Sequence, residues 1–538
     1  MEFKFRNNYC FNNAVRHFLY IDDLIFPEFQ LTGENLSWST PIKLKIRKDY
    51  ESNNYRILKM PNILNFKYCY EYYKTLPNFD KINNISRNSR MSVNYDNGTF
   101  KEKSYSKSLN NDLQILCVYD RLLKMDIKSF YDRIYNHIVF ALVRSSDRYY
   151  SSMNNGDTNG LILGNYISLY FAEIMLKKIS DELEQKFQQE KINVTFSYFS
   201  DDFYFFCDKK DVEKIETIFN EILVSNNFTE SEDKRLNVKY DEYNNDNIID
   251  RYWKKIINCQ SENNEKWNKI LEERNEKVDS NKNKYYYLIL NQLLYRASLL
   301  EKYNSKNSKK QNILVNGFFK SMYWYILDES LYKFTYENVH QLTYIYKEYS
   351  ETILYSVNKF KNINSSLLSM LKDNIIKLFE KTLDDNFEER QLYLAYACLT
   401  LYDDFEKLPE LFEKVIKSKN QLLISYLLFN SNSFKNYILE NSIANLLNES
   451  EDNWFLNYHY LLLMYNEKLI LINDLDDYIA NYLLPKAQKK DLARKNYLYF
   501  YSENLKANKK FIAMQNEVIT SIDTYLRKRN HYKESINK

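Results

Sequence analysis

The chain has 538 residues, of which 44% are hydrophobic, and its 75 basic and 72 acidic side chains leave a net charge near +3. This length predicts roughly two or three domains with full hydrophobic cores, and the balanced charge excludes a protein that holds nucleic acid by bulk charge alone. Apolar runs are too short for a membrane-spanning helix and there is no secretory segment, so we expect a cytoplasmic protein without a membrane partner. The six cysteines lack the spacing of zinc sites or disulfide frameworks.

The first predicted element that carries chemistry is a strand ending at Asp126. Residues 122–125 have the character of a buried strand, and apolar residues then recur with helical spacing from Phe130 to Leu142. The pattern therefore predicts a strand and then a helix, with a carboxylate between them. Taken alone, Asp126 could equally be a helix N-cap or a surface acid.

Glycines cluster in the next segment. Three of the six glycines in the chain fall within residues 156–164, directly before a run with helical spacing from Ile167 to Ile179. Such a cluster predicts backbone that bends sharply or lies close to a ligand. A loop of this kind at a helix start could hold a nucleotide or a nucleic-acid backbone, and an ordinary loop is the alternative. The spacing fits neither a Walker loop nor a dinucleotide-binding fingerprint.

Residues 194–207 form strand-like, aromatic-rich sequence with Asp201 and Asp202 at the centre. This predicts a β-hairpin with two acids at its tip, for which a purely polar turn is the alternative. A buried carboxylate is costly unless it is paired or binds a cation, and hard cations prefer oxygen ligands. Together with Asp126, the pair predicts the converging acids of two-metal phosphoryl transfer, with Mg²⁺ or else Mn²⁺ as the cation.

The rest of the chain is predicted to be mostly helical. A helix is expected from Val212 to Ser225, followed by a charged stretch that contains Lys234. Beyond residue 284, apolar residues recur with helical spacing, for example in the segments 286–294, 367–378, 392–399 and 458–463. We therefore expect an α+β domain over residues 1–275 and an all-helical domain over residues 276–538. Helix pairs of roughly 40 residues would match HEAT-like units.

Basic and aromatic residues alternate near the C-terminus. Lysines and arginines between Lys486 and Lys510 interleave with Tyr497, Tyr499, Phe500 and Tyr501. Cations for phosphates together with rings for stacking are typical of proteins that bind single strands. An amphipathic helix with a solvated basic face is the alternative.

Three segments resemble, in sequence order, motifs A, B and C of the reverse transcriptase palm. They are Asp126 to His137, Gly160 to Glu173, and Phe199 to Asp202, and the segment Glu232 to Val238 resembles motif D with its lysine. The resemblance covers roughly residues 55–245. It implies an α+β reverse-transcriptase fingers–palm, here followed by an all-α HEAT-like helical repeat domain.

The resemblance also implies roles for the three acids and for Tyr131. Asp126, Asp201 and Asp202 would be the catalytic, metal-binding residues, with Asp202 often a supporting rather than a direct ligand. Tyr131 lies at the steric-gate position, where a ring clashes with a ribose 2′-hydroxyl and favours deoxynucleotides.

Further residues are expected at the incoming dNTP by the same resemblance. Gly164 and Asn165 would lie near the nucleotide, and Lys234 would lie near its triphosphate, with a solvated loop lysine as the alternative. Arg87 and Arg90 in the fingers could also contact triphosphate.

Departures from the usual motifs indicate a subgroup. Ile162 and Leu163 replace the proline and the glutamine or serine of the usual motif B. Asn165, Glu173 and the long helical C-terminal half are more similar to the abortive-infection (Abi) reverse transcriptases of bacterial phage defence. This resemblance implies DNA synthesis without a template, primed from a protein tyrosine, with a single-stranded DNA product that stays covalently attached. It also implies a homo-oligomer.

Tyrosine is abundant, with 50 residues, which the codons of an AT-rich genome explain most simply. Tyr9 and Tyr20 near the N-terminus are candidates for the priming residue, and each could instead be a packing residue. Two other functions stay open from the sequence. One is an RNA-templated defence reverse transcriptase that uses a noncoding RNA, and the other is a degenerate palm that acts as an oligomeric scaffold.

Overall fold

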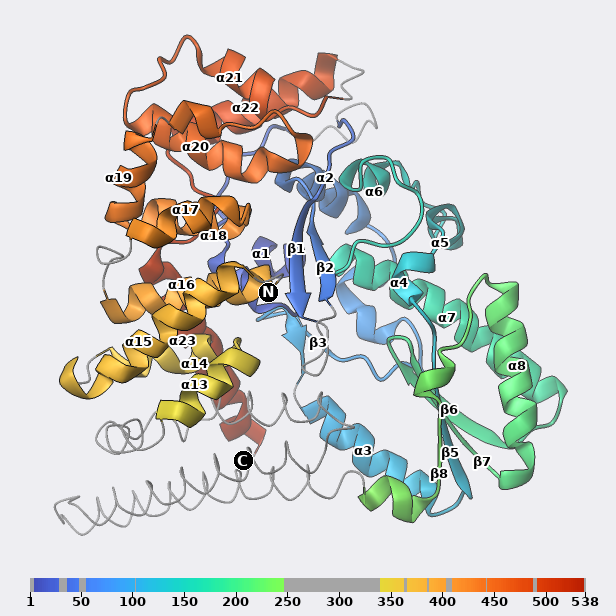
Figure 1. Cartoon of the computed structure of the whole chain (residues 1–538). Helices are drawn as coiled ribbons and strands as arrows, with labels where there is room; N and C mark the ends of the chain where they lie inside the picture. Colours follow the sequence, from blue (N-terminus) through green and yellow to red (C-terminus); the bar gives the residue numbers. More distant parts are fainter. Residues whose placement is uncertain are drawn as a thin grey trace.

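The computed structural model describes residues 4–28, 36–47, 55–101, 103–245, 339–361, 365–384, 387–402, 409–441, 443–486 and 491–536. The predicted domain boundary at residue 275 and the predicted helical segment 286–294 lie outside these residues. Figure 1 shows a sheet-containing part on one side and the C-terminal helices on the other. The N-terminal elements, drawn in blue, lie between the two parts.

The sheet-containing part is built on a four-stranded antiparallel sheet with the strand order β6-β7-β5-β8. Its strands are β5 (Arg121–Asp126), β6 (Val194–Phe199), β7 (Asp202–Cys207) and β8 (Leu236–Val238). The predicted strand that ends at Asp126 and the predicted hairpin at residues 194–207 are therefore confirmed. The two lie together in the sheet because β5 pairs with β7 along its whole length.

The register between β5 and β7 decides which side chains share a face. Asp126 lies opposite Asp202, and Lys124 lies opposite Tyr204. Residues directly opposite each other point to the same side of a sheet, and so do alternate residues of one strand. The two acids, the lysine and the tyrosine therefore share one face, and the intervening Phe203 points to the other.

Two helices cover the face to which Phe203 points. They are α7 (Tyr166–Gln189) and α8 (Val212–Ser225), and both were predicted, although α7 continues beyond the expected end at Ile179. The ring of Phe219 on α8 lies 5.3 Å from that of Phe203, centroid to centroid. The acid-bearing face is covered at its opposite end by α3 (Lys103–Leu116). The small buried cluster there is formed by Leu116, Leu122, Phe206 and Val238.

The predicted single helix from Phe130 to Leu142 is wrong in part. The segment forms two short helices, α4 (Phe130–Arg133) and α5 (Asn136–Leu142), followed by α6 (Arg148–Met153). The break arises because the backbone between α4 and α5 bonds to the glycine loop: Gly160 N donates to Ile134 O at 2.9 Å, and Asn136 N donates to Thr158 O at 3.0 Å. Leu142, the last residue of α5, is exposed.

The N-terminal elements form a small layer of their own. They are α1 (Phe5–Tyr9), β1 (Ile42–Arg47), β2 (Tyr55–Met60), α2 (Ile63–Tyr73), β3 (Val93–Asn94) and β4 (Thr99–Phe100). β1 and β2 make an antiparallel pair, and α2 follows β2 directly with an aromatic-rich sequence.

The C-terminal part is helical throughout the described residues. Its helices are α13 (Val339–Glu348), α14 (Thr352–Ser356), α15 (Ser365–Leu383), α16 (Glu388–Tyr402), α17 (Pro409–Lys417), α18 (Gln421–Asn430), α19 (Asn432–Glu440), α20 (Trp454–Asn466), α21 (Leu475–Tyr482), α22 (Asp491–Lys506) and α23 (Gln515–Ile536). The helices α16, α18, α20 and α22 contact one another in that order, and α15, α17 and α19 form a second row. This is a layered helical array, and its HEAT-like character stays a prediction. In the described ranges, no helix combines the length and the apolarity that a membrane span requires.

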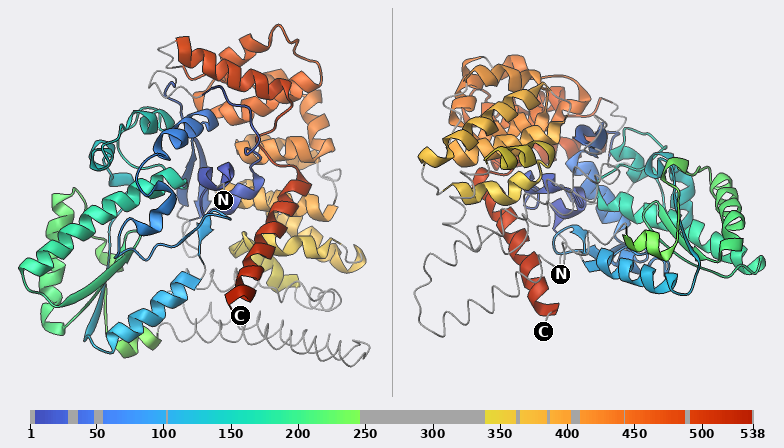
Figure 2. Two further views of the ribbon diagram at one scale, coloured as in Figure 1. Left: turned by 180° about the vertical axis from the view of Figure 1, so that it is seen from behind. Right: turned by 60° about the horizontal axis from the view of Figure 1, so that its bottom comes forward.

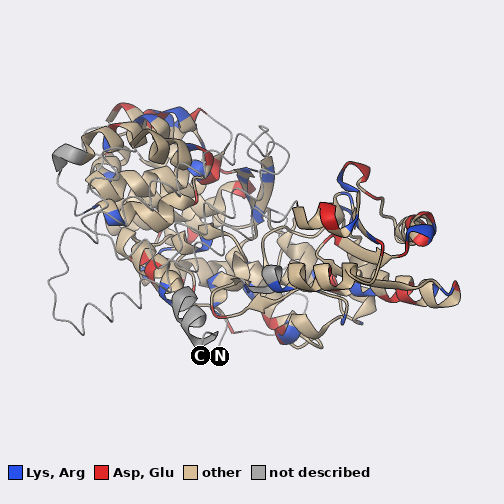
Figure 3. Cartoon of the chain, turned by 90° about the horizontal axis from the view of Figure 1, so that it is seen from below, with Lys and Arg blue, Asp and Glu red and all other residues tan. Residues whose placement is uncertain are grey.

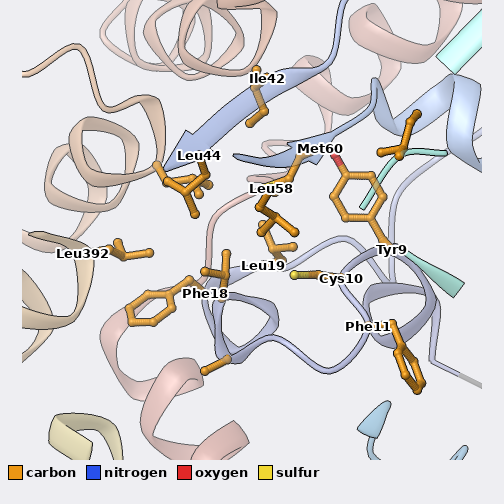
Figure 4. Close-up of a cluster of buried hydrophobic side chains, with 14 of the residues drawn as sticks. Tyr9, Cys10, Phe11, Phe18, Leu19, Ile42, Leu44, Leu58, Met60 and Leu392 are labelled. Carbon is orange, nitrogen blue, oxygen red and sulfur yellow. The ribbon is translucent and has the colours of Figure 1, made fainter. Parts of the chain in front are cut away.

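Residues near the N-terminus are built into this helical array. Leu19 and Ile512 form an isolated antiparallel bridge, and Tyr20 N donates to Phe511 O at 2.9 Å. The red helix α23 lies close to the N-terminal segment in both views of Figure 2. Figure 4 shows Phe18 pointing towards Leu392 of α16 in a shared cluster of buried side chains. The two ends of the chain thus contribute to one continuous hydrophobic core.

We expect Tyr497→Phe to lower the melting temperature by roughly 2–4 °C, because it removes a buried hydrogen bond between the two ends of the chain. The Tyr497 hydroxyl donates to Asn65 Oδ1 at 2.5 Å, and both residues are fully buried. Tyr499→Phe on the same helix is the control, because the Tyr499 side chain is 47% exposed. Thermal unfolding followed by circular dichroism measures both, and equal melting temperatures would contradict the inferred role of this bond.

Candidate active site

The hairpin between β6 and β7 holds its acids on a very short turn. Phe199 pairs with Asp202, so Ser200 and Asp201 alone form the loop. Ser200 has a φ of 53°, a left-handed conformation that is strained for a residue with a side chain. The turn is tied to the neighbouring strand, because Ile127 N donates to Asp201 O at 3.0 Å. This bond fixes the hairpin tip beside the residue that follows Asp126.

Asp126 is buried and electrostatically crowded. Its side chain is 4% exposed, and Lys234 Nζ lies 2.7 Å from its Oδ2. Its other oxygen, Oδ1, is buried without a hydrogen-bond partner among the described residues. Burial raises the pKa of Asp126 to about 6; Lys234 opposes this shift, and the negative charges of Asp201 and Asp202 add to it.

A second lysine, which the motif analysis missed, neutralises the hairpin. Lys124 Nζ lies 3.1 Å from Asp202 Oδ2 and 5.3 Å from the centroid of the Tyr204 ring. Its position could have been found in the sequence, because a residue two before Asp126 on a predicted strand shares its face. Two of the three carboxylates are therefore paired with ammonium groups, Asp126 with Lys234 and Asp202 with Lys124.

The donor set fits a hard divalent cation, although the oxygens do not yet converge on one point. In the part of the chain that the structure describes, no three acidic, histidine or cysteine side chains form a ready metal cluster. Two of the oxygens are instead turned to lysines, Asp126 Oδ2 to Lys234 and Asp202 Oδ2 to Lys124. The buried Asp126 Oδ1, for which the described residues supply no donor, is the atom that most needs a cation.

Tyr131 lies within electrostatic reach of Asp201 and of Glu173, a buried acid on α7. Burial raises the pKa of the Tyr131 phenol, and the nearby charges of Glu173 and Asp201 raise it further. The backbone of Tyr131 is fixed to the glycine loop, since Leu161 N donates to its carbonyl at 2.8 Å. Burial raises the pKa of Glu173 to about 7, and the Tyr198 hydroxyl donates to its Oε2 at 3.4 Å. The Asp201 charge thus acts on Tyr131, whose steric-gate role stays a prediction.

Gly164 and Asn165 have clear structural tasks at the start of α7. Gly164 has a φ of +104°, and a Cβ there would lie 2.0 Å from Leu58 Cδ1, so another residue would be strained and would displace the Leu58 side chain. Asn165 caps α7, because Ser168 N donates to its Oδ1 at 2.9 Å. The sharp bend that the glycines predict is thus present, and contact with a dNTP stays a prediction for both residues.

Arg90 and Arg87, the arginines predicted to contact triphosphate, are both paired with acids in the structure. Arg90 donates through its two terminal nitrogens to Asp112, at 2.9 and 2.6 Å, and its guanidinium carbon lies 3.8 Å from the centroid of the Tyr204 ring. Arg87 pairs with Glu184 on α7. The prediction that these two contact triphosphate is contradicted for Arg90, whose side chain holds α3 against the sheet.

Of the two candidate priming tyrosines, Tyr9 matches the alternative of a packing residue. It is 2% exposed in α1, and its hydroxyl donates to Pro61 O at 2.5 Å. Figure 4 shows its ring pointing towards Met60 in the buried cluster. Tyr20 is 37% exposed, but burial and the nearby Glu517 and Asp23 raise its pKa. Burial for the first, and acidic neighbours for the second, disfavour attack on a triphosphate.

The predicted stacking surface near the C-terminus is contradicted for most of its rings. Tyr497, Phe500 and Tyr501 are fully buried, and Tyr501 accepts a hydrogen bond from Asn62 Nδ2 at 2.6 Å. Tyr499 is exposed, as are several of the basic side chains of α22. Figure 3 shows basic and acidic segments interspersed over both parts of the molecule. The segment therefore matches the alternative, an amphipathic helix with a solvated basic face.

Comparison with known proteins yields only weak similarities. No family model and no curated protein matches the chain. Telomerase from Candida albicans, solved with the TWJ fragment of telomeric RNA, is 11% identical with a TM-score of 0.28, over 79% of this chain and 66% of that one. Apo telomerase from Candida tropicalis is 9% identical with a TM-score of 0.28, over 74% and 71%. Similarity of this size assigns neither fold nor activity.

We expect Glu173→Gln to stabilise the protein at pH 8 by roughly 1–3 kcal/mol and to have much less effect at pH 5. The pKa of Glu173 is raised from 4.5 to about 7 in the folded protein. The stability of the fold that depends on protonated Glu173 is therefore fully present below pH 4.5 and is lost as the pH rises through 7. Glutamine resembles the protonated acid and has no charge to bury. Melting temperatures at the two pH values measure the effect, and an equal shift at both would contradict it. Glu184→Gln, on the same helix and half-buried, is the control.

Proposed function

We propose that this chain is a metal-dependent nucleotidyltransferase of the reverse-transcriptase kind that joins dNTPs into DNA. One observation carries the proposal: Asp126 lies opposite Asp202 across β5 and β7, with Asp201 tied beside them on the hairpin tip. Like charges placed this close are unfavourable unless a cation is shared. The buried Asp126 Oδ1, left unpaired by the described residues, would be a costly defect in a mere scaffold.

The residues have distinct tasks in this reaction. Asp126 and Asp201 would hold Mg²⁺, which when bound polarises phosphate oxygens and lowers the pKa of an attacking hydroxyl. Asp202, paired with Lys124, keeps the hairpin in register and adds negative charge to the site. A 3′-hydroxyl oxygen forms a bond to the α-phosphorus while the bond to pyrophosphate breaks. Lys234 is positioned to neutralise the departing pyrophosphate.

The finer assignment follows from the Abi-like motif B and the long helical region. We infer that synthesis needs no template, begins on a tyrosine hydroxyl of the protein, and serves phage defence in a homo-oligomer. The helical array supports this inference because it is joined to the N-terminal layer through a shared core, as an integral part of the enzyme. Since Tyr9 is buried and Tyr20 has acidic neighbours, the priming tyrosine is to be sought among the other 48 of the 50 tyrosines.

The proposal is tested by Asp126→Ala and Asp201→Ala, each of which we expect to lower dNTP incorporation by at least roughly 10³-fold. The measurement is labelled dNTP incorporation with Mg²⁺, with circular dichroism to show that the variants are folded. Asp181→Ala is the matched control, because Asp181 is an exposed acid on α7 that pairs with Lys177. Full activity in a folded Asp201→Ala protein would overturn the proposal.

The same assay separates the modes of synthesis. Nuclease-treated protein is incubated with each labelled dNTP, without template or primer, and run on a denaturing gel before and after protease treatment. We expect label that migrates with the protein and is released by protease, and mass spectrometry then identifies the tyrosine. Product only after RNA is added would instead assign a templated reverse transcriptase that uses an RNA partner.

We expect Tyr131→Ala to increase ribonucleotide incorporation relative to deoxynucleotide incorporation, on the order of 10-fold or more. The ring lies beside Glu173 and Asp201, where it would meet the sugar of a nucleotide held at the acids. Tyr135→Ala is the control, since Tyr135 is 43% exposed in the same segment. The ratio of kcat/KM for the two nucleotides measures discrimination, and an unchanged ratio would remove Tyr131 from this role.

A further inference from the structure

Lys234 is in direct contact with Asp126, which a role at the triphosphate alone does not explain. Lys234 Nζ lies 2.7 Å from Asp126 Oδ2, within hydrogen-bonding distance of the acid that would hold the cation. The backbone around the lysine is anchored to the same residue: Ser231 N donates to Asp126 O at 2.8 Å, and Lys234 N donates to Ser231 O at 3.0 Å. The ammonium group is thus tethered next to the carboxylate by a short hydrogen-bonded loop.

The side chain of Lys234 is nevertheless free to swing. It is 48% exposed and belongs to a three-residue 3-10 turn, Glu232–Lys234, rather than to a strand. Lys124 provides the contrast, because it is 29% exposed, is fixed within β5 and lies near the Tyr204 ring. Of the two lysines at the acids, Lys234 is therefore the one that can leave its carboxylate without disturbing the sheet.

A divalent cation and the Lys234 ammonium compete for the same acid. An ammonium at hydrogen-bonding distance repels a cation that binds the adjacent oxygens, and it occupies Oδ2 itself. This explains why the described acids do not converge into a ready metal cluster although their strands place them together. An incoming triphosphate offers the ammonium a more negative partner within reach of the same turn.

We propose that Lys234 is a tethered counter-ion of Asp126 that competes with the divalent cation in the free protein and transfers to the triphosphate when a nucleotide arrives. Cation binding is then weak without nucleotide and strengthens with it, so the two enter the site together. This inference rests on the proposed function, because it requires that the triphosphate of a dNTP binds at these acids. A lysine that contacted only the triphosphate would, in contrast, leave the affinity of the acids for the cation unchanged.

The test measures cation and nucleotide binding separately, with no reliance on turnover. Mn²⁺ binding to the full chain is followed by electron paramagnetic resonance without nucleotide, and binding of a non-hydrolysable dNTP analogue is then measured with Mn²⁺ present. For Lys234→Met we expect Mn²⁺ affinity to rise and analogue affinity to fall, each on the order of 5–10-fold. Lys234→Arg keeps the charge and should stay near wild type in Mn²⁺ affinity.

The controls make each outcome decisive. Lys239→Met removes an exposed lysine just beyond β8, near the end of β5 remote from Asp126, and should change neither affinity. Lys234→Gln repeats the measurement if the methionine variant does not fold. An unchanged or weakened Mn²⁺ affinity in folded Lys234→Met overturns the inference, whatever happens to the analogue. If wild type and all variants bind neither Mn²⁺ nor analogue, the proposed function itself fails as well.

Discussion

The structure depends on holding three carboxylates together at one end of a sheet, against their mutual repulsion. Asp126 and Asp202 are directly opposed, and Asp201 is locked onto the adjacent strand by its carbonyl. Apolar packing on the other face, where Phe203 and neighbouring rings lie against α7 and α8, offsets this repulsion. Two lysines on the acid face reduce it further. Strain at Ser200 is tolerated because both hairpin strands are fixed by this packing.

Further contacts anchor the elements around the acids. Arg90 fixes α3 to the far end of the acid face, and the glycine loop fixes the backbone of Tyr131. Gly164 lets α7 begin directly against Leu58 of the N-terminal hairpin. The sheet, the N-terminal layer and the C-terminal helices thus support one another, and Lys234 stands out as a residue with freedom of movement beside the acids.

How much could be predicted from the sequence depended on the range of the interactions. The strand at Asp126, the hairpin and α8 followed from local alternation and spacing, which one element determines by itself. The break between α4 and α5 could not be predicted, because the backbone of Ile134 bonds to a loop more than twenty residues away. The burial of Tyr9 and Tyr501 was missed for the same reason, since their partners lie in distant parts of the chain. Lys124 was predictable from strand geometry, and only the choice of motif residues left it out.

The bridge between Leu19 and Ile512 has a consequence for how the protein is made. A ribosome delivers the strands that carry the acids long before it delivers Ile512, so the four-stranded sheet can form before the N-terminal residues meet their partner. During that interval Phe18 and its apolar neighbours lack the helices that bury them in the finished molecule. Closing the long loop between Leu19 and Ile512 also costs conformational entropy, which slows folding. The N-terminal residues therefore complete their packing only after translation of the helical array has ended.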